Sequence, residues 1–154
     1  MLARKSALGF VPVVLVAFLA TAVLAANAHF VSASARRSGN DLLASFKEAG
    51  LGDTTTVTVV LQATSTANYA CFNNGGHNPA AQNKRTVVSD VSVSGQFTSG
   101  KNGSVSGSLR LSPAGPGSFS CPGGQHLVLQ SASYSNVRIV DTTSGASIGI
   151  PGTF

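Results

Sequence analysis

Apolar and polar residues alternate along most of the chain after residue 28. Between positions 86 and 98 most apolar residues occupy odd positions, and residues 105–111 repeat the pattern. Because successive side chains of a β-strand point to opposite faces, a period of two predicts a strand with one buried face. Asn102-Gly103 between the two stretches is typical of a tight turn. We therefore expect residues 86–98 and 105–111 to form a hairpin.

The same alternation predicts six further strands. They cover residues 30–36, 41–47, 54–66, 125–131, 134–141 and 146–150. The first two flank Arg37-Ser-Gly-Asn40, which predicts a second hairpin, and Asp141-Thr-Thr-Ser-Gly145 is expected to turn the last pair. No window has helical spacing, and glycine is too frequent for long helices. About eight short strands predict an all-β, immunoglobulin-like antiparallel β-sandwich, with a small closed barrel as the alternative.

Two segments rich in glycine, proline and asparagine interrupt the alternation, at residues 71–84 and 112–124. Each contains one of the two cysteines, Cys71 and Cys121. In an oxidising compartment such a pair forms an intramolecular disulfide, which would join the two segments. Loops held on a rigid sheet often carry binding sites, so this joined pair is the predicted binding surface. Its candidate residues are Phe72, Asn73, Asn74, His77 and Phe119.

The first 28 residues have the organisation of a secretory signal peptide. Arg4 and Lys5 precede an apolar run over residues 7–24, and Ala26-Asn27-Ala28 follows as a small-x-small cleavage motif. An uncleaved membrane anchor is the alternative, because 18 apolar residues are just long enough to span a bilayer. The cleavage motif and the alanine-rich end of the run favour removal. We expect residues 1–28 to be the signal peptide and residues 29–154 to be a single secreted, extracellular domain.

The charge of the chain is moderately basic. Removal of Arg4 and Lys5 lowers the basic residues from ten to eight, against five acidic ones, which leaves a formal net charge of +3. The basic residues are spread along the chain, and there are two tyrosines and no tryptophan. Nucleic-acid binding requires a denser basic surface, often with aromatic side chains that stack on bases. We expect no nucleic-acid partner.

Histidine offers the sharpest possibility of a metal site. After cleavage, the α-amine and imidazole of His29 could together bind Cu(II), and His77 or His126 could add another imidazole. Copper favours nitrogen ligands in tetragonal geometry. The simpler interpretation is that His29 is an exposed residue after the cleavage site, since no other copper motif accompanies it. We expect no cofactor, with copper at these histidines as the alternative.

Signals for hydrolytic catalysis are weak. No Gly-x-Ser-x-Gly motif is present. The acidic residues are few and scattered, and no two of them suggest the facing carboxylates that a glycosidase requires. They are Asp41, Glu48, Asp53, Asp90 and Asp141. The sequence therefore predicts a non-catalytic interaction or structural module, whose partner is an extracellular protein or a cell-wall glycan.

Several short motifs of the mature chain are similar to those of a known group of proteins. They are His29-Phe30-Val31, Lys47-Glu-Ala-Gly-Leu-Gly52, Cys71-x-Asn-x-Gly-Gly with Pro79 and Asn83-Lys84, and Pro151-Gly-Thr-Phe154. On these motifs the chain resembles small, uncharacterised secreted bacterial β-sandwich proteins. The resemblance implies cleavage before His29 and a β-sandwich. It does not point to any particular activity.

Overall fold

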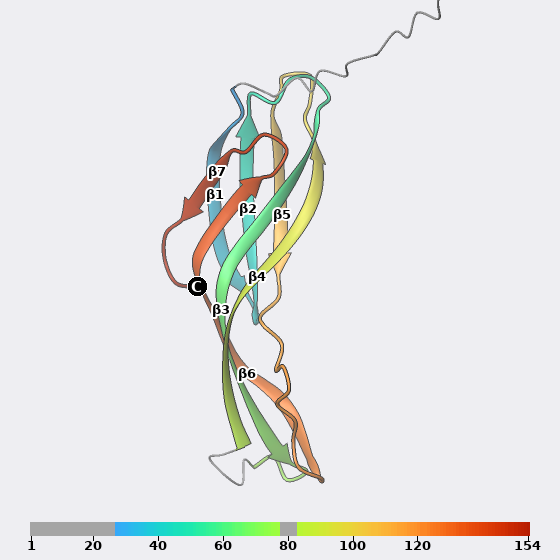
Figure 1. Ribbon diagram of the computed structural model, residues 1–154, viewed down its shortest axis with the longest axis vertical. Helices are drawn as coiled ribbons and strands as arrows, with labels where there is room; N and C mark the ends of the chain where they lie inside the picture. Colours follow the sequence, from blue (N-terminus) through green and yellow to red (C-terminus); the bar gives the residue numbers. More distant parts are fainter. Residues whose placement is uncertain (1–26, 78–82) are drawn as a thin grey trace, which may run out of the picture.

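The computed structural model describes residues 27–77 and 83–154, and within these ranges it contains seven β-strands (Figure 1). They are β1 (His29–Ser38), β2 (Asp41–Ala49), β3 (Thr56–Asn73), β4 (Lys84–Thr98), β5 (Val105–Leu111), β6 (Gln125–Asp141) and β7 (Ser147–Ile150). One antiparallel sheet has the order β1-β2-β5, and the other has the order β4-β3-β6-β7. The predicted all-β architecture with two antiparallel sheets is confirmed.

The structure does not test the predicted signal peptide. Residues 1–26, which include the apolar run, lie outside the described residues. Within the described ranges, no helix has the length and hydrophobicity needed to cross a membrane.

The molecule has two parts, a body and an arm. In the body the two sheets lie face to face, whereas in the arm only β3, β4 and β6 continue, as a narrow three-stranded ribbon (Figure 1). We define the arm as residues 65–77, 83–89 and 112–131, and the body as the other described residues. The irregular segment 112–124 runs along the arm between β5 and β6.

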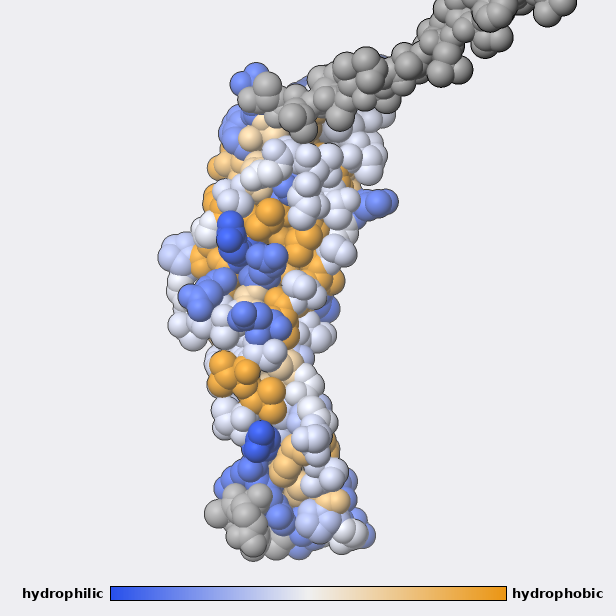
Figure 2. Space-filling model, in the orientation of Figure 1, coloured by the Kyte–Doolittle hydropathy of each residue, from blue (hydrophilic) through white to orange (hydrophobic). Residues whose placement is uncertain are grey.

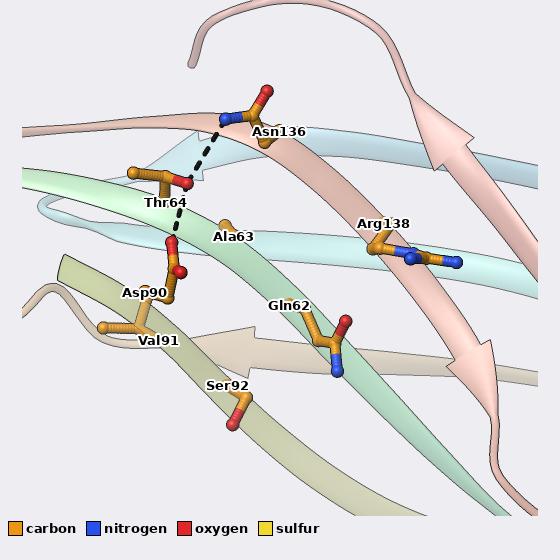
Figure 3. Close-up of a pocket in the computed structure, with 8 residues that line it drawn as sticks. All are labelled: Gln62, Ala63, Thr64, Asp90, Val91, Ser92, Asn136 and Arg138. Atoms are coloured by element: carbon orange, nitrogen blue, oxygen red, sulfur yellow. Dashed lines mark hydrogen bonds between the residues drawn. The ribbon is translucent and has the colours of Figure 1, made fainter.

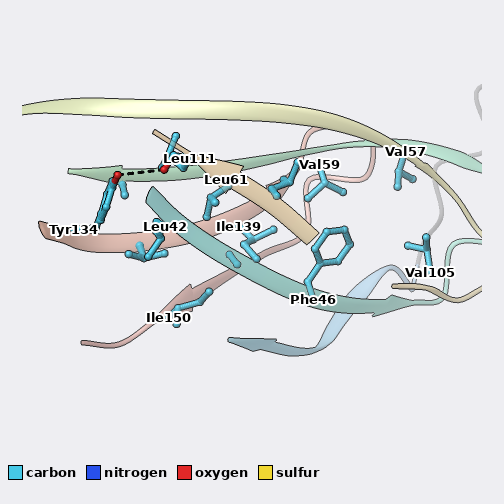
Figure 4. Packing of buried hydrophobic residues seen from close by; sticks show 14 of the residues in the cluster. Leu42, Phe46, Val57, Val59, Leu61, Val105, Leu111, Tyr134, Ile139 and Ile150 are labelled. Atoms are coloured by element: carbon cyan, nitrogen blue, oxygen red, sulfur yellow. Dashed lines mark hydrogen bonds between the residues drawn. The ribbon is translucent and has the colours of Figure 1, made fainter. Parts of the chain in front are cut away.

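The core of the body forms where the inward faces of the two sheets meet (Figure 4). The predicted inward face of β3 is confirmed, since Val57, Val59, Leu61 and Ala63 are all buried. Opposite them, Phe46 of β2 makes an edge-to-face contact with Phe97 of β4, with ring centroids 5.0 Å apart. The alternation of the sequence thus produces a hydrophobic layer between the sheets.

Gly107 of β5 shows how tightly this layer packs. A Cβ atom at this position would lie 2.4 Å from the Phe97 ring and 2.9 Å from the Phe46 ring. Any side chain here would therefore displace both rings, which explains a glycine inside a strand.

The predicted hairpin between residues 86–98 and 105–111 is wrong, although both strands exist. β4 pairs with β3 and β5 pairs with β2, so the connection crosses from one sheet to the other. Asn102-Gly103 does lie in a tight turn, with a hydrogen bond from the Gly103 amide to the Gly100 carbonyl. Alternation specifies which face of a strand is buried, but it does not specify which strand lies beside it. The other two hairpins, β1–β2 and β6–β7, are confirmed.

The structure has seven strands where the sequence predicts about eight, because residues 125–131 and 134–141 belong to one continuous strand, β6. Two irregularities in the pairing of β6 with β3 break its alternation without ending it. β3 is also longer than predicted and reaches Asn73, so the beginning of the expected loop 71–84 is strand.

The predicted disulfide joins Cys71 of β3 to Cys121 of the irregular segment. Two hydrogen bonds hold the same segment further along the arm. The Tyr69 hydroxyl donates to the Ala114 carbonyl at 2.7 Å, and the Ala114 amide donates to the Ser65 hydroxyl at 3.1 Å. The segment therefore covers the inward face of the arm, where no second sheet is present.

Candidate functional site

The outward face of the four-stranded sheet carries a long array of hydroxyl and amide side chains. Odd positions of β3 are buried from Val57 to Cys71, so the even positions face outward, and they are mostly polar. They are Thr56, Thr58, Gln62, Thr64, Thr66 and Asn68, with Val60, Ala70 and Phe72 as the apolar exceptions. The even positions of β4 are all exposed and include mainly serine, threonine and glutamine. Figure 2 shows this side of the body as a mosaic of hydrophilic and hydrophobic residues.

The first hollow on this face, which we call the central hollow, has a volume of about 410 Å³. Its walls come from β3, β4 and β6 (Figure 3). The lining residues are Gln62, Ala63, Thr64, Asp90, Val91, Ser92, Asn136 and Arg138.

Hydrogen bonds across the three strands organise the central hollow. The Asn136 amide donates to the Thr64 hydroxyl at 3.3 Å, and that hydroxyl donates to the Asp90 carboxylate at 2.8 Å (Figure 3). Among the described residues, the side chains of Gln62 and Arg138 make no intramolecular hydrogen bond. Their donors therefore remain free for a ligand at the rim of the hollow.

A β-bulge positions Asn136 in this hollow. Gln62 pairs with Arg138 and Thr64 pairs with Ser135, so β6 advances three residues where β3 advances two. Asn136 takes up the difference with a left-handed backbone, at φ +52°. Asparagine tolerates this conformation better than most residues, and a bulge redirects a side chain from its regular position.

A second hollow, which we call the arm hollow, lies further along the same three strands and has a volume of about 370 Å³. The lining residues are Asn68, Tyr69, Ala70, Phe72, Lys84, Arg85, Thr86 and Gln130. It also coincides with a bulge in β6, because Asn68 pairs with Ser131 while Tyr69 pairs with Leu129, which leaves Gln130 without a partner on β3. The central and arm hollows therefore share one origin.

Asn68 connects the strands beside the arm hollow. Its side-chain oxygen accepts a hydrogen bond from the Thr86 hydroxyl at 2.6 Å, and its amide donates to the Ser131 hydroxyl at 2.9 Å. These contacts link β3 to β4 and to β6 across the polar face.

The predicted binding residues gather at the end of the arm. Phe72 lines the arm hollow, and its ring centroid lies 6.4 Å from that of His126. Asn73 shapes the turn, because its side-chain oxygen accepts hydrogen bonds from the amides of Gly75 and His77, both at 3.0 Å.

Asn74 and His77 are exposed in that turn, and Phe119 is half-buried two residues before Cys121. The predicted surface is thus partly assembled through the disulfide. The central hollow, the larger of the two, lies on the sheet outside this predicted surface. Alternation along a strand does not reveal that a sheet face is concave.

The structure does not bring the three histidines together. His29 begins β1 at one end of the molecule, whereas His77 and His126 lie at the far end of the arm (Figure 1). The His29 Nδ1 atom lies 2.8 Å from the Asn27 carbonyl oxygen. Among the described residues there is no group of three or more metal-ligating His, Cys, Asp or Glu side chains. A copper site that combines these histidines has no geometric support, and binding by His29 alone stays a prediction.

A pair of buried carboxyl groups, Glu48 and Asp141, was missed by the sequence analysis. Glu48 comes from β2 and Asp141 from the end of β6, so they belong to different sheets, and both are fully buried. The Asp141 carboxylate accepts hydrogen bonds from the Thr143 amide at 2.8 Å and the Ser144 hydroxyl at 2.5 Å. The oxygens of Glu48 make no hydrogen bond of regular geometry.

Burial, followed by the nearby Asp141 carboxylate, raises the pKa of Glu48 from 4.5 to about 7. Alternation could have revealed half of this pair, since Glu48 continues the inward series of Leu42, Ala44 and Phe46. Because both carboxyl groups are sealed between the sheets, a substrate cannot reach them unless the sandwich opens. The pair therefore affects stability.

No protein-family model, no curated protein and no solved structure matches the chain. The resemblance to small secreted bacterial β-sandwich proteins, together with cleavage before His29, accordingly stays a prediction.

Proposed function

We propose that this protein is a secreted, non-catalytic binding module that holds an extended, hydroxyl-rich polymer along the outward face of its four-stranded sheet. The polymer we favour is a glycan of the cell wall or the extracellular space. The observation that carries the proposal is the pair of hollows on one polar sheet face, each formed at a bulge in β6.

The spacing of the hollows favours an extended ligand. Thr64 lines the central hollow and Ala70 lines the arm hollow, six residues further along β3. At the rise of a β-strand this corresponds to about 20 Å. A small molecule would occupy one hollow, whereas a polymer chain could follow the strands and fill both.

The chemistry of the face favours a glycan over a protein partner. Hydroxyl and amide groups donate and accept hydrogen bonds as sugar hydroxyl groups do. A protein interface normally has an apolar centre with aromatic anchors. Aromatic side chains are scarce on this face, with Phe72 in the arm hollow, so we expect weak binding per sugar and a gain from several sugars bound at once.

The proposal has two further parts: the protein is exported, and its topology is immunoglobulin-like. The N-terminal leader and the Cys71–Cys121 disulfide support release into an oxidising space, and the sequence resemblance supports a bacterial source. Strand order supports the topology, because β1-β2-β5 facing β4-β3-β6-β7 corresponds to A-B-E facing C′-C-F-G. An experimental structure that places β4 in the sheet of β1 would contradict this assignment.

The function is tested with protein exported from cells that express the full chain. Gel mobility in the presence of soluble polysaccharides, and co-sedimentation with insoluble cell-wall polymers, measure binding. The double variant Gln62→Ala/Arg138→Ala removes free donors from the central hollow and should weaken binding roughly tenfold.

The matched control, Arg36→Ala/Ser45→Ala, removes exposed polar groups from the other sheet and should bind as the wild type does. The proposal fails if no polymer binds the wild type, or if both double variants bind equally well.

A further inference from the structure

We propose that the free edge of β4 in the arm pairs antiparallel with the same edge of a second copy of this chain, which gives a two-fold symmetric dimer. The paired stretch is residues 84–90, in which Lys84 lies opposite the partner's Asp90. The inference does not depend on glycan binding, because it concerns the edge of the four-stranded sheet, whereas the proposed function concerns its outward face.

β4 is the outermost strand of its sheet, so one of its edges has no neighbouring strand among residues 27–77 and 83–154. It is 15 residues long and pairs with β3 along its whole length without a bulge. A long, regular edge presents a row of amide and carbonyl groups that another strand can pair with, and proteins often protect such an edge with a bulge, a proline or several charges. Between residues 86 and 98, β4 has no proline and one charged residue, Asp90.

The other strand edges are shorter or interrupted. β1, at one edge of the three-stranded sheet, has an irregularity between Phe30 and Ser32 and carries the charged residues Arg36 and Arg37. β5, at the other edge, has 7 residues, and β7 has 4. β6, which β7 covers only in part, has two irregularities in its pairing with β3. The edge of β4 is therefore the one best suited to a partner strand.

Side-chain alternation and charge together select one register for this pairing. The even residues of β4 face outward and the odd residues face inward, so a partner strand continues both faces only if even residues lie opposite even residues. This condition separates Asp90 from Arg85 and allows it to lie opposite Lys84. The two meet when the pair is centred on Val87, whereas a register centred on Asp90 would place two carboxylates opposite one another, which is unfavourable.

The centre of this register brings β-branched side chains together. Val87 lies opposite the partner's Val87 on the inward face, and Thr86 lies opposite the partner's Val88 on the outward face. Val88 is 63% exposed, more than any other large apolar side chain of the described residues. Cross-strand pairs of β-branched residues stabilise a sheet, and the pairing would remove part of this apolar surface from water.

Lys84 and Asp90 have no oppositely charged partner within the described part of one copy, where the single ion pair joins Arg110 to Asp41. Lys84 is exposed at the start of β4, and the Asp90 carboxylate accepts a hydrogen bond from the Thr64 hydroxyl through its Oδ1 atom. In the dimer the two charges lie opposite one another on each side of the two-fold axis. This charge complementarity favours a second copy of the chain over an unrelated strand.

The proposed pairing gives the dimer a defined shape. Because the paired strands are antiparallel and meet in the arms, the two bodies lie at opposite ends. Because residues of the same face lie opposite one another, both outward faces lie on one side of the joined sheet. Only the arms are in contact, and interfaces of this small size are typical of reversible association.

The test measures the monomer–dimer equilibrium by sedimentation velocity, with purified protein from cells that express the full chain. We expect the dimer to grow with protein concentration and to weaken as salt rises. Lys84→Glu and Asp90→Lys each place like charges opposite one another and should weaken dimerisation roughly tenfold. The double variant Lys84→Glu/Asp90→Lys restores opposite charges in the reverse sense and should dimerise as the wild type does.

Recovery in the double variant distinguishes a contact between the two positions from a loss of folding, because a second charge reversal would not rescue a misfolded protein. The matched control Lys101→Glu makes the same charge change at an exposed position of the body and should leave dimerisation unchanged. Hydrogen exchange tests the register. Amides within residues 84–90 should gain protection as the protein concentration rises, whereas those of residues 92–98 should not.

Three results of sedimentation would overturn the inference: a monomer at every concentration, a dimer that both single charge reversals leave unchanged, or no recovery in the double variant. Protection that extends through residues 92–98 would contradict the contact between Lys84 and Asp90. None of these results bears on glycan binding, which the double variant Gln62→Ala/Arg138→Ala tests separately.

Discussion

The body and the arm use the same three strands but stabilise them differently. In the body, β3 has a second sheet opposite its inward face, and large side chains such as Leu61, Tyr134 and Ile139 are fully buried there. In the arm, the inward residues Ala67, Tyr69 and Cys71 lie outside that hydrophobic cluster. In the arm, the Cys71–Cys121 disulfide and a few hydrogen bonds hold the irregular segment 112–124 over the inward face instead. The comparison shows how a sheet can extend beyond its core and still present a continuous outward face.

The largest expected effect comes from removing the disulfide. Cys71→Ser/Cys121→Ser opens a link between residues 50 positions apart, which chain entropy values at up to about 4 kcal/mol of unfolding free energy. Because the body has its own core, we expect amide protons of the arm to lose protection from hydrogen exchange while those of β2 and β5 keep theirs. Equal loss of protection in both regions would show that the arm and body unfold as one unit.

The second effect concerns the body, where Glu48 lies beside Asp141. Its pKa in the folded protein, about 7, exceeds its ordinary value of 4.5, so the folded state binds this proton more tightly. The resulting stabilisation is fully present below pH 4.5 and is lost as the pH rises through 7, by up to about 3 kcal/mol. Glu48→Gln should therefore become more stable than the wild type as the pH rises from 4.5 to 8.

Urea unfolding of both proteins at a series of pH values measures this difference directly. The variant Asp41→Asn serves as control, since Asp41 is partly exposed and belongs to a surface ion pair. A difference between wild type and Glu48→Gln that stays constant with pH would refute the assignment to Glu48.

The smallest expected effect comes from removing one tyrosine hydroxyl, that of Tyr69 in the arm or that of Tyr134 in the body, which have equivalent roles. In the arm the Tyr69 hydroxyl donates to the Ala114 carbonyl, and in the body the Tyr134 hydroxyl donates to the Asn40 carbonyl at 2.8 Å. Replacing either by phenylalanine should cost about 1 kcal/mol. Tyr69→Phe should accelerate exchange only in the arm, whereas Tyr134→Phe should lower the midpoint of global unfolding. Identical exchange patterns would remove the distinction between the regions.

Sequence patterns located most strands because alternation reports burial directly. The inward series of β3 and β5 followed from alternation. The pairing of Cys71 with Cys121 was predicted on other grounds, namely that the chain has two cysteines and is expected in an oxidising compartment. The hairpin of β4 with β5 was wrong because a tight turn connects sheets as readily as it connects neighbouring strands. Alternation places Glu48 on the inward face of β2, but its pairing with Asp141 could not be read from the sequence, because Asp141 is distant in the chain and comes from the other sheet.

The candidate site was likewise predicted only in part from the sequence. Phe72 and Asn73 were expected near a binding surface, yet the two hollows depend on bulges at Gln130 and Asn136. A bulge depends on the register between β6 and β3, which alternation within one strand does not reveal.

The sequence by itself determined the class of structure, the buried faces of β3, β4 and β5 and the single disulfide, because these depend on local periodicity and on residue type. Only the tertiary structure decided which strands became neighbours and where the polar face became concave. Those features arise from contacts between residues far apart in the chain, which depend on the register between paired strands and on how the two sheets pack against one another.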